Sequence, residues 1–392
     1  MERIEFIYFN AGGGHRATAE SLQEVIRLQK RRWQADLVNL FEVLDPENRL
    51  QAWTRHSPED FYNARLANGH TFGMGMELRL LQQGIRAAHP WLVRRLVDHW
   101  RRSQPDLVVS LVPNFNRALR QSLAQVCPQT PYVTLMTDLA DLPPRFWIEQ
   151  GMDQHVICGT PQALSQARRA GIPLEALHLT SGMVIRPSFY APAPTSACRA
   201  RARQALGLDP DRLTGVVMYG AHGSAAMLDI ARVLPDTQLL LMCGHNESLA
   251  GQLNSLRRLA PLATVGYTRD VAGKMQMADF FIGKPGPGCL SEAIRLGLPV
   301  LTFHNGSTMP QERFNAQWVR EVGVGHALAS VRQLPEGLRS LQQDWGTYMS
   351  RTRMQNNRAV FEVPEILDAL LRSQRARTQR TQPPLQEMAR AA

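Results

Sequence analysis

The sequence predicts an α/β protein of two domains, each built on a parallel sheet. Three observations predict this fold class. The chain has 392 residues, which is too long for one ordinary domain and suggests two or three. Short apolar runs alternate with helix-period sequence in both halves of the chain, and a proline-rich segment separates the halves.

Each expected strand is a short apolar run, as in a parallel sheet that helices cover on both faces. A turn and a stretch with helical spacing follow each run. In the first half the expected strands are residues 4–9, 107–112, 132–136 and 156–158. In the second half they are residues 216–219, 239–243, 280–282 and 300–303.

The proline-rich segment predicts the domain boundary. Pro187, Pro192 and Pro194 disfavour regular structure, so we place the boundary near Pro187. The expected N-terminal domain covers residues 1–187 and the C-terminal domain residues 188–370, whose last helix can pack back on the first domain. Residues 371–392 are rich in Arg and Gln and predict a basic, flexible tail.

Composition excludes several classes of protein. Hydrophobic residues at 44% and charged residues at 20% are globular values and exclude wholesale disorder. The net charge of +10 indicates an anionic partner, such as a phosphorylated metabolite, an acidic membrane or nucleic acid. Five cysteines without CxxC spacing argue against a disulfide framework or a zinc cluster. No signal peptide or membrane-spanning run is apparent, so a cytoplasmic protein is expected.

A glycine loop follows the first expected strand. Gly12, Gly13 and Gly14 lie between that strand and a stretch with helical spacing. Glycine lets the backbone approach a ligand closely, and free N–H groups at a helix start attract an anion or a hydroxyl group. Because the helix dipole disfavours a charged imidazole, His15 is expected to be neutral and able to act as a general base.

Two other interpretations of this loop stay open. The glycines can simply form a tight turn that leaves His15 exposed. The pattern Gly12-x-Gly14-x-x-Ala17 also satisfies the dinucleotide fingerprint, with Asp36 at about the distance of a ribose-binding acid. That pattern would indicate an NAD(P)-dependent oxidoreductase, although Asp36 precedes the apolar stretch that follows the helix, whereas the ribose acid belongs at the far end of a strand.

A second glycine loop gives the strongest signal in the chain. Lys284, Gly286 and Gly288 lie between an apolar strand and a helix, where backbone N–H groups can hold a diphosphate. Glu292 is expected within the first turn of that helix, and its carboxylate can accept hydrogen bonds from a neutral diol such as a ribose. The polar cluster that follows can read sugar hydroxyls and contains Gln311, Glu312 and Asn315.

These motifs, in this order, resemble the monogalactosyldiacylglycerol synthase branch of glycosyltransferase family 28. The resemblance covers nearly the whole chain. It is carried by segments 12–17 (GGGHRA), 137–147 (TD to W), 181–189 (SGMVIRPSF), 206–223, 286–300 (GPG to GLPV) and 311–315.

The resemblance implies the GT-B architecture, in which two Rossmann-like α/β domains hold their parallel sheets facing across a cleft. It also implies an inverting glycosyltransferase that moves a hexose from a UDP-sugar to a lipid such as diacylglycerol at the membrane surface. No metal or cofactor beyond the UDP-sugar co-substrate is expected.

Residue roles follow from the same resemblance. His15 would be the catalytic base, with Gly12, Gly13, Gly14 and Asp138 on the acceptor side. The donor-binding residues would be Gly220, His222, Gly223, Tyr267, Lys284, Gly286, Gly288, Glu292, Gln311, Glu312 and Asn315.

Three departures from the family pattern leave the acceptor open. The family's histidine between TD and W is absent, the hinge reads Met183-Val184, and the loop 219–223 has fewer glycines than usual. A GT-B enzyme acting on a non-lipid acceptor and a nucleotide-sugar epimerase are therefore alternatives.

Residues 51–102 predict contact with an anionic membrane, as a peripheral protein on the inner face of the plasma membrane. Trp53, Phe61, Tyr62, Phe72, Met74 and Met76 come first, and then Leu92, Val93, Leu96, Val97 and Trp100 share one helix face beside Arg94, Arg95, Arg101 and Arg102. No nucleic-acid partner is expected, because the basic residues are dispersed and no recognised binding module appears.

Overall fold

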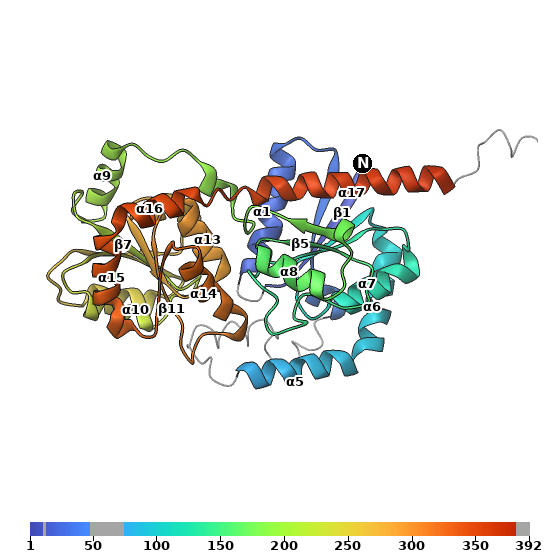
Figure 1. Cartoon of the computed structure of the whole chain (residues 1–392), viewed down its shortest axis with the longest axis horizontal. Coiled ribbons are helices and arrows are strands. Elements are labelled where there is room, and N and C mark those ends of the chain that lie inside the picture. The colour runs from blue at the N-terminus through green and yellow to red at the C-terminus, as the bar shows by residue number, and fades with distance from the viewer. Residues whose placement is uncertain (11–12, 48–73, 382–392) are drawn as a thin grey trace, which may run out of the picture.

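The computed structural model describes residues 1–10, 13–47 and 74–381, which form two α/β domains side by side (Figure 1). Each domain contains a six-stranded sheet in which every described strand pair is parallel. The fold class expected from the sequence is thus confirmed. The predicted stretch 53–72 lies outside the described residues.

The first sheet has the strand order β2-β1-β3-β4-β5-β6. Its strands are β1 (Glu2–Tyr8), β2 (Trp33–Asn39), β3 (Leu107–Ser110), β4 (Tyr132–Leu135), β5 (His155–Cys158) and β6 (Leu177–Leu179). The helices of this domain are α1 (Gly14–Leu28), α2 (Leu40–Leu44), α5 (Met74–Ala87), α6 (His89–Ser103), α7 (Asn116–Val126), α8 (Pro161–Arg169) and the 3-10 helix η1 (Leu174–Ala176).

Successive side chains of β1 point to opposite faces of the sheet, and each face is covered by a different part of this domain's core. Ile4 and Phe6 pack with residues of α1, while Ile7 packs with Leu96 and Trp100 of α6. The apolar face of α6 is therefore buried in the domain core and is not available to a membrane. Our expectation that this face meets a membrane was wrong, because its periodicity reflects core packing.

The second sheet has the strand order β12-β11-β10-β7-β8-β9. Its strands are β7 (Thr214–Met218), β8 (Gln238–Gly244), β9 (Leu262–Gly266), β10 (Phe280–Gly283), β11 (Val300–Phe303) and β12 (Gly325–Leu328). The helices of this half are α9 (Ser196–Ala205), α10 (Ala226–Val233), α11 (Glu247–Asn254), α12 (Val271–Met275), α13 (Pro287–Arg295), η3 (Pro310–Glu312), α14 (Arg313–Glu321), η4 (Val331–Gln333), α15 (Leu334–Gln343) and α16 (Trp345–Met354).

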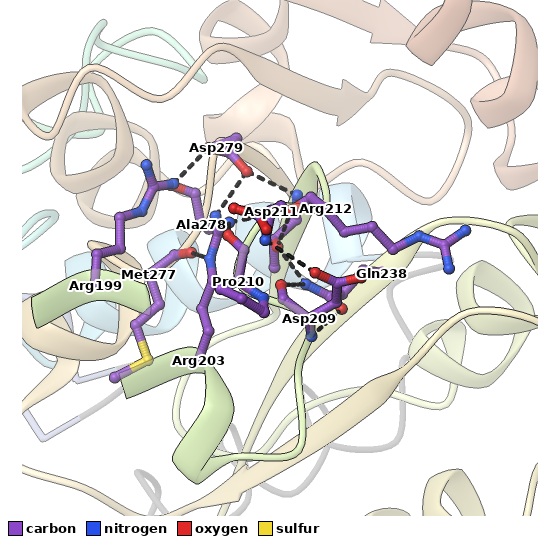
Figure 2. Close-up of polar contacts among 11 residues, drawn as sticks. Arg199, Arg203, Asp209, Pro210, Asp211, Arg212, Gln238, Met277, Ala278 and Asp279 are labelled. Carbon is purple, nitrogen blue, oxygen red and sulfur yellow. Dashed lines mark hydrogen bonds and ion pairs between the residues drawn. The ribbon is translucent and has the colours of Figure 1, made fainter. Parts of the chain in front are cut away.

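A buried polar network joins α9 to the amino edge of the second sheet (Figure 2). Arg203 is 4% exposed, donates to the carbonyls of Met277, Pro210 and Arg212, and forms an ion pair with Asp279 at 2.7 Å. Since Asp279 also accepts from the Thr214 backbone N–H, one carboxylate connects α9 to the starts of β7 and β10.

The chain crosses between the domains twice. The first crossing contains η2 (Pro187–Tyr190), at the proline-rich segment, and the second leads into α17 (Ala359–Thr381). α17 returns to the first domain, where Val360, Val363 and Leu367 join the core beside α1 (Figure 1). The segment expected to be a flexible tail from residue 371 continues α17 to Thr381, and residues 382–392 lie outside the described part of the chain.

None of the helices in the described ranges has the length and apolar character needed to cross a bilayer.

Candidate active site

The first glycine loop ends in an uncapped helix start that faces the second domain (Figure 1). Gly13 has a φ of 75°, a left-handed conformation that favours glycine, and α1 begins at Gly14. No side chain caps the helix, so the N–H groups of its first turn lack a side-chain acceptor from the cap residue. Gly12 lies outside the described residues.

His15 is the second residue of α1 and is half-buried. Its Nδ1 lies 3.1 Å from Oγ1 of Thr137, and its ring centroid lies 5.9 Å from that of Trp147. Burial lowers the pKa of His15 to about 4, and a hydrogen bond to the Leu111 backbone opposes this shift. The imidazole is therefore neutral at pH 7 and can accept a proton.

Asp138 follows Thr137 in the loop after β4. It is 7% exposed and accepts a hydrogen bond of 2.8 Å from the indole N–H of Trp147. Burial is the main cause that raises the pKa of Asp138 to about 7; Glu312 also raises it, and Lys284 lowers it. Because Glu312 and Lys284 belong to the second domain, this loop lies at the interface between the domains.

The second glycine loop forms another uncapped helix start, that of α13. Gly286 is the cap residue without a side-chain hydrogen bond, and Pro287 contributes no N–H. The space around Gly288 is open, since a Cβ there would meet no atom within 4 Å. The start of α13, at the carboxyl end of β10, is thus the type of helix N-terminus that attracts anions.

Lys284 and Glu312 form an ion pair near this helix start. The Lys284 ammonium lies 3.0 Å from Oε1 of Glu312, and the two side chains are 31% and 6% exposed. A Cβ on Gly286 would lie 3.4 Å from Cε of Lys284. Gly286 therefore keeps the approach to this ion pair clear.

Glu292 lies in the second turn of α13, not in the first turn as expected from the sequence, because the helix begins at Pro287. Burial raises the pKa of its carboxyl to about 7, and Arg186 in the first crossing lowers it. Within the described residues this carboxylate has no hydrogen-bond partner, so its oxygens retain their capacity to accept hydrogen bonds.

The polar cluster after β11 divides into different roles. Glu312 pairs with Lys284, and the Gln311 side chain contacts Met309 at 3.7 Å. Asn315 is fully buried, and its side-chain amide donates a hydrogen bond of 2.8 Å to the carbonyl of Pro285. This bond holds the second glycine loop against α14. The Oδ1 atom of Asn315 is buried and has no hydrogen-bond partner among the described residues.

The loop after β7 contains further residues that the sequence resemblance assigns to donor binding. Gly220 and Gly223 have φ values of 82° and 61°, and a 3.4 Å hydrogen bond joins them. His222 lies in a row with two further rings, since its centroid is 5.9 Å from His245, which stacks on Tyr267 at 4.2 Å. Tyr267 is 61% exposed, so this row forms an accessible aromatic surface at the ends of β7, β8 and β9.

The predicted residues thus gather at the carboxyl ends of the two sheets. Asp36 does not belong to this group: it lies within β2 and bonds to Arg3 at 2.7 Å, which argues against the dinucleotide interpretation. In the described ranges, no group of three or more His, Cys, Asp or Glu side chains could hold a metal ion.

Comparison with known proteins identifies the relatives of this chain. No protein-family model matches it. It is 26% identical over 402 residues to the chloroplastic monogalactosyldiacylglycerol synthase of Spinacia oleracea, covering 95% of this chain and 73% of that protein. The Arabidopsis thaliana monogalactosyldiacylglycerol synthase 1 is 25% identical over 403 residues, covering 95% and 71%.

The chain is a relative of the monogalactosyldiacylglycerol synthases.

Solved structures show that this relative has the GT-B fold. Acinetobacter baumannii MurG superposes with a TM-score of 0.59 at 12% identity, covering 94% of this chain and 100% of that one. UDP-GlcNAc 2-epimerase from Neisseria meningitidis, bound to UDP-GlcNAc, gives 0.55 at 13% identity, covering 94% and 99%. Together with the sequence relatives, these comparisons support a glycosyltransferase.

The structure also adds residues to the site of this monogalactosyldiacylglycerol synthase relative. Thr137 and Trp147 lie beside His15, Arg186 lowers the pKa of Glu292 through its charge, and His245 stacks on Tyr267. The sequence shows Thr137 and Trp147 only as parts of a motif. The sequence offers one signal that His245 belongs to the site, which is its position just after an expected strand.

Proposed function

We propose that this protein transfers a hexose from a UDP-sugar to the hydroxyl of a lipid acceptor such as diacylglycerol, with inversion at the anomeric carbon. One observation carries the proposal. A neutral imidazole at the start of α1 faces a domain whose α13 start offers open backbone N–H groups beside Lys284.

The acceptor hydroxyl would bind next to His15. As its oxygen attacks the anomeric carbon, the imidazole takes the hydroxyl proton and the bond from that carbon to the diphosphate oxygen breaks. The diphosphate leaves with the electron pair, and the proton passes from His15 to solvent. Thr137 would hold the imidazole in position through its contact with Nδ1.

The donor would bind along the carboxyl edge of the second sheet. The N–H groups of Gly288 and Cys289 would hold the diphosphate, and Glu292 would accept hydrogen bonds from the ribose. Tyr267, stacked on His245, offers a ring face to the base. These positions support UDP-sugar binding without requiring a resident metal ion, and we expect activity to persist in EDTA.

A transfer assay tests the proposal. Purified protein is mixed with labelled UDP-galactose, UDP-glucose or UDP-GlcNAc and with diacylglycerol in anionic vesicles. We expect label in the lipid fraction with one of these donors, and we expect His15→Ala to lower kcat by about 10²–10⁴-fold while UDP binding persists.

His178→Ala is the matched control, since His178 lies in the edge strand β6, where its ring nitrogen is 3.4 Å from that of His155. It should leave transfer unchanged. Full activity of His15→Ala would refute the proposed base. Conversion of the donor without transfer to any lipid would instead favour the epimerase alternative.

We further propose that an anionic membrane is contacted through α5 and the start of α6. Leu80, Leu81 and Trp91 are large apolar side chains with exposed fractions of 61%, 53% and 44%. The Arg95 guanidinium lies 5.9 Å from the Trp91 ring centroid, a pairing suited to an interface of acyl chains and phosphate.

Vesicle sedimentation tests this surface. The protein should pellet with phosphatidylglycerol vesicles at low salt, and Leu80→Ser combined with Trp91→Ser should release it. Met354→Ser changes an exposed side chain of the other domain and serves as control, with 76% of Met354 exposed. Equal pelleting of all three proteins would contradict the proposed surface.

A further inference from the structure

An apolar cluster joins the first domain to α14 of the second domain. Leu139 and Ala140, in the loop after β4, pack with Phe314 near the start of α14. The exposed fractions of these three side chains are 1%, 0% and 8%, so the contact excludes water. Met183 of the first crossing belongs to the same cluster. Figure 1 shows α14 on the side of the second domain that faces the first.

The first-domain part of this cluster is connected to the candidate base. Leu139 lies two residues after Thr137, whose hydroxyl is 3.1 Å from Nδ1 of His15. The hydroxyl of Thr160, at the start of α8, donates a hydrogen bond to the backbone carbonyl of Leu139. These contacts attach residues 137–139 to the rest of the first domain, so the loop and the imidazole hold one arrangement.

The second-domain part of the cluster is connected to the second glycine loop. Glu312, two residues before Phe314, forms the ion pair with Lys284 at 3.0 Å. Asn315, the next residue after Phe314, donates its 2.8 Å hydrogen bond to the carbonyl of Pro285. The start of α14 and the loop that leads into α13 therefore form one connected unit.

Sugar transfer requires these two units to lie at a defined separation. His15 belongs to the first domain and the start of α13 to the second, so contacts within either domain do not set the distance between them. The reacting atoms must come within about 3–3.5 Å of each other, and a displacement of about 1 Å can cost about 10²-fold in rate. A ring buried across the domain boundary can set this separation, because close-packed apolar contacts tolerate little displacement.

We propose that Phe314 is a positioning residue, which sets the distance between His15 and the sugar donor by packing against the loop after β4. The inference rests on the proposed function. It gives Phe314 a role in the transfer step and none in holding UDP, since the residues proposed to hold UDP all belong to the second domain.

Kinetic and binding measurements on Phe314→Ala test this role. We expect kcat for sugar transfer to fall about 10²-fold, while the affinity for UDP, measured by calorimetry, stays unchanged. Phe314→Leu keeps much of the apolar volume and should recover most of the rate. Leu139→Ala should also lower kcat, and it carries the same test if Phe314→Ala does not fold. The double variant should lose little more than either single variant, because both remove one shared contact.

Leu338→Ala is the matched control, because Leu338 is a 6% exposed side chain of α15 that packs in a different cluster of the second domain. It should lower the urea midpoint of unfolding and leave kcat unchanged, which separates a loss of stability from a loss of position. Unchanged kcat in Phe314→Ala and Leu139→Ala, additive losses in the double variant, or weaker UDP binding by Phe314→Ala would overturn the inference while the proposed function stands. Failure of the unaltered protein to transfer sugar would remove both.

Discussion

Burial sets the charge states of the site residues. His15 is kept neutral, while Asp138 and Glu292 are held at the edge of ionisation near neutral pH. In each case desolvation is the leading cause, so burial at these positions favours the uncharged form of both acids and bases. A ligand that binds beside these groups changes their surroundings and can therefore change their charge states.

Glu292 predicts a pH dependence of donor binding. Its pKa is raised to about 7, so the carboxylate that we propose accepts hydrogen bonds from a ribose is progressively lost as pH falls through 7. UDP affinity measured between pH 6 and pH 9 should fall on the acid side of this range. Glu292→Gln should bind UDP more weakly with a flat profile, whereas Glu247→Gln, at an exposed position of α11, should keep the unaltered profile.

Asp138 predicts a pH dependence of stability. Its pKa of about 7 lies above the ordinary 3.8, so the unfolded chain ionises first and stability falls as pH rises from about 4 to about 7. Three pKa units correspond to about 4 kcal/mol, an upper value for the gain of Asp138→Asn at pH 8. Denaturant unfolding at pH 5 and pH 8 measures the free energy of unfolding that tests this prediction. Asp98→Asn, which changes a carboxylate of an exposed ion pair, is the control.

Residue identity was easier to predict from sequence than residue role. The described residues of the two glycine loops and His15 follow strand ends as the motifs indicate, and Glu312 lies in η3. The Lys284–Glu312 pair and the contact of Asn315 with Pro285 depend on distances between segments 28 and 30 residues apart in the chain. Sequence spacing alone does not determine such contacts.

Among the elements, interior strands were predictable and edge strands were not. All eight predicted strands are present, within two residues at either end. The four missed strands, β2, β6, β9 and β12, are the outer strands of their sheets and are only partly buried. An edge strand has one neighbour and more solvent contact, so it lacks the continuous apolar run that identifies a buried one.

Helix α9 supplies a prediction about folding energetics. Arg203→Ala would leave the carbonyls of Met277, Pro210 and Arg212 without their buried donor and Asp279 without one of its cations. Such losses cost about 3–5 kcal/mol of unfolding free energy. Urea unfolding should show this loss, and Arg201→Ala, exposed on the same helix, should stay within about 0.5 kcal/mol. Equal stability of both variants would contradict the role assigned to Arg203.

At the scale of the whole molecule, the two domains depend on one another through the returning helix. Sequence periodicity indicated the two sheets, but the final docking of α17 depends on a match between its apolar side chains and those of α1. Leu139 and Ala140 of the first domain also cluster with Phe314 of α14. Contacts of this kind join segments far apart in the chain, so sequence periodicity does not identify the partners.

The two crossings between the domains lie against each other. The backbone N–H of Arg358 donates to the Ser181 hydroxyl at 2.7 Å, and the N–H of Ser181 donates to Glu362. The second domain is thus an insertion within the chain of the first domain, which contains both β1 and α17. Joining residue 181 to residue 358 through a short glycine linker should give a free-standing amino half with α17 in place, and heteronuclear NMR of that miniprotein would reveal whether it folds alone.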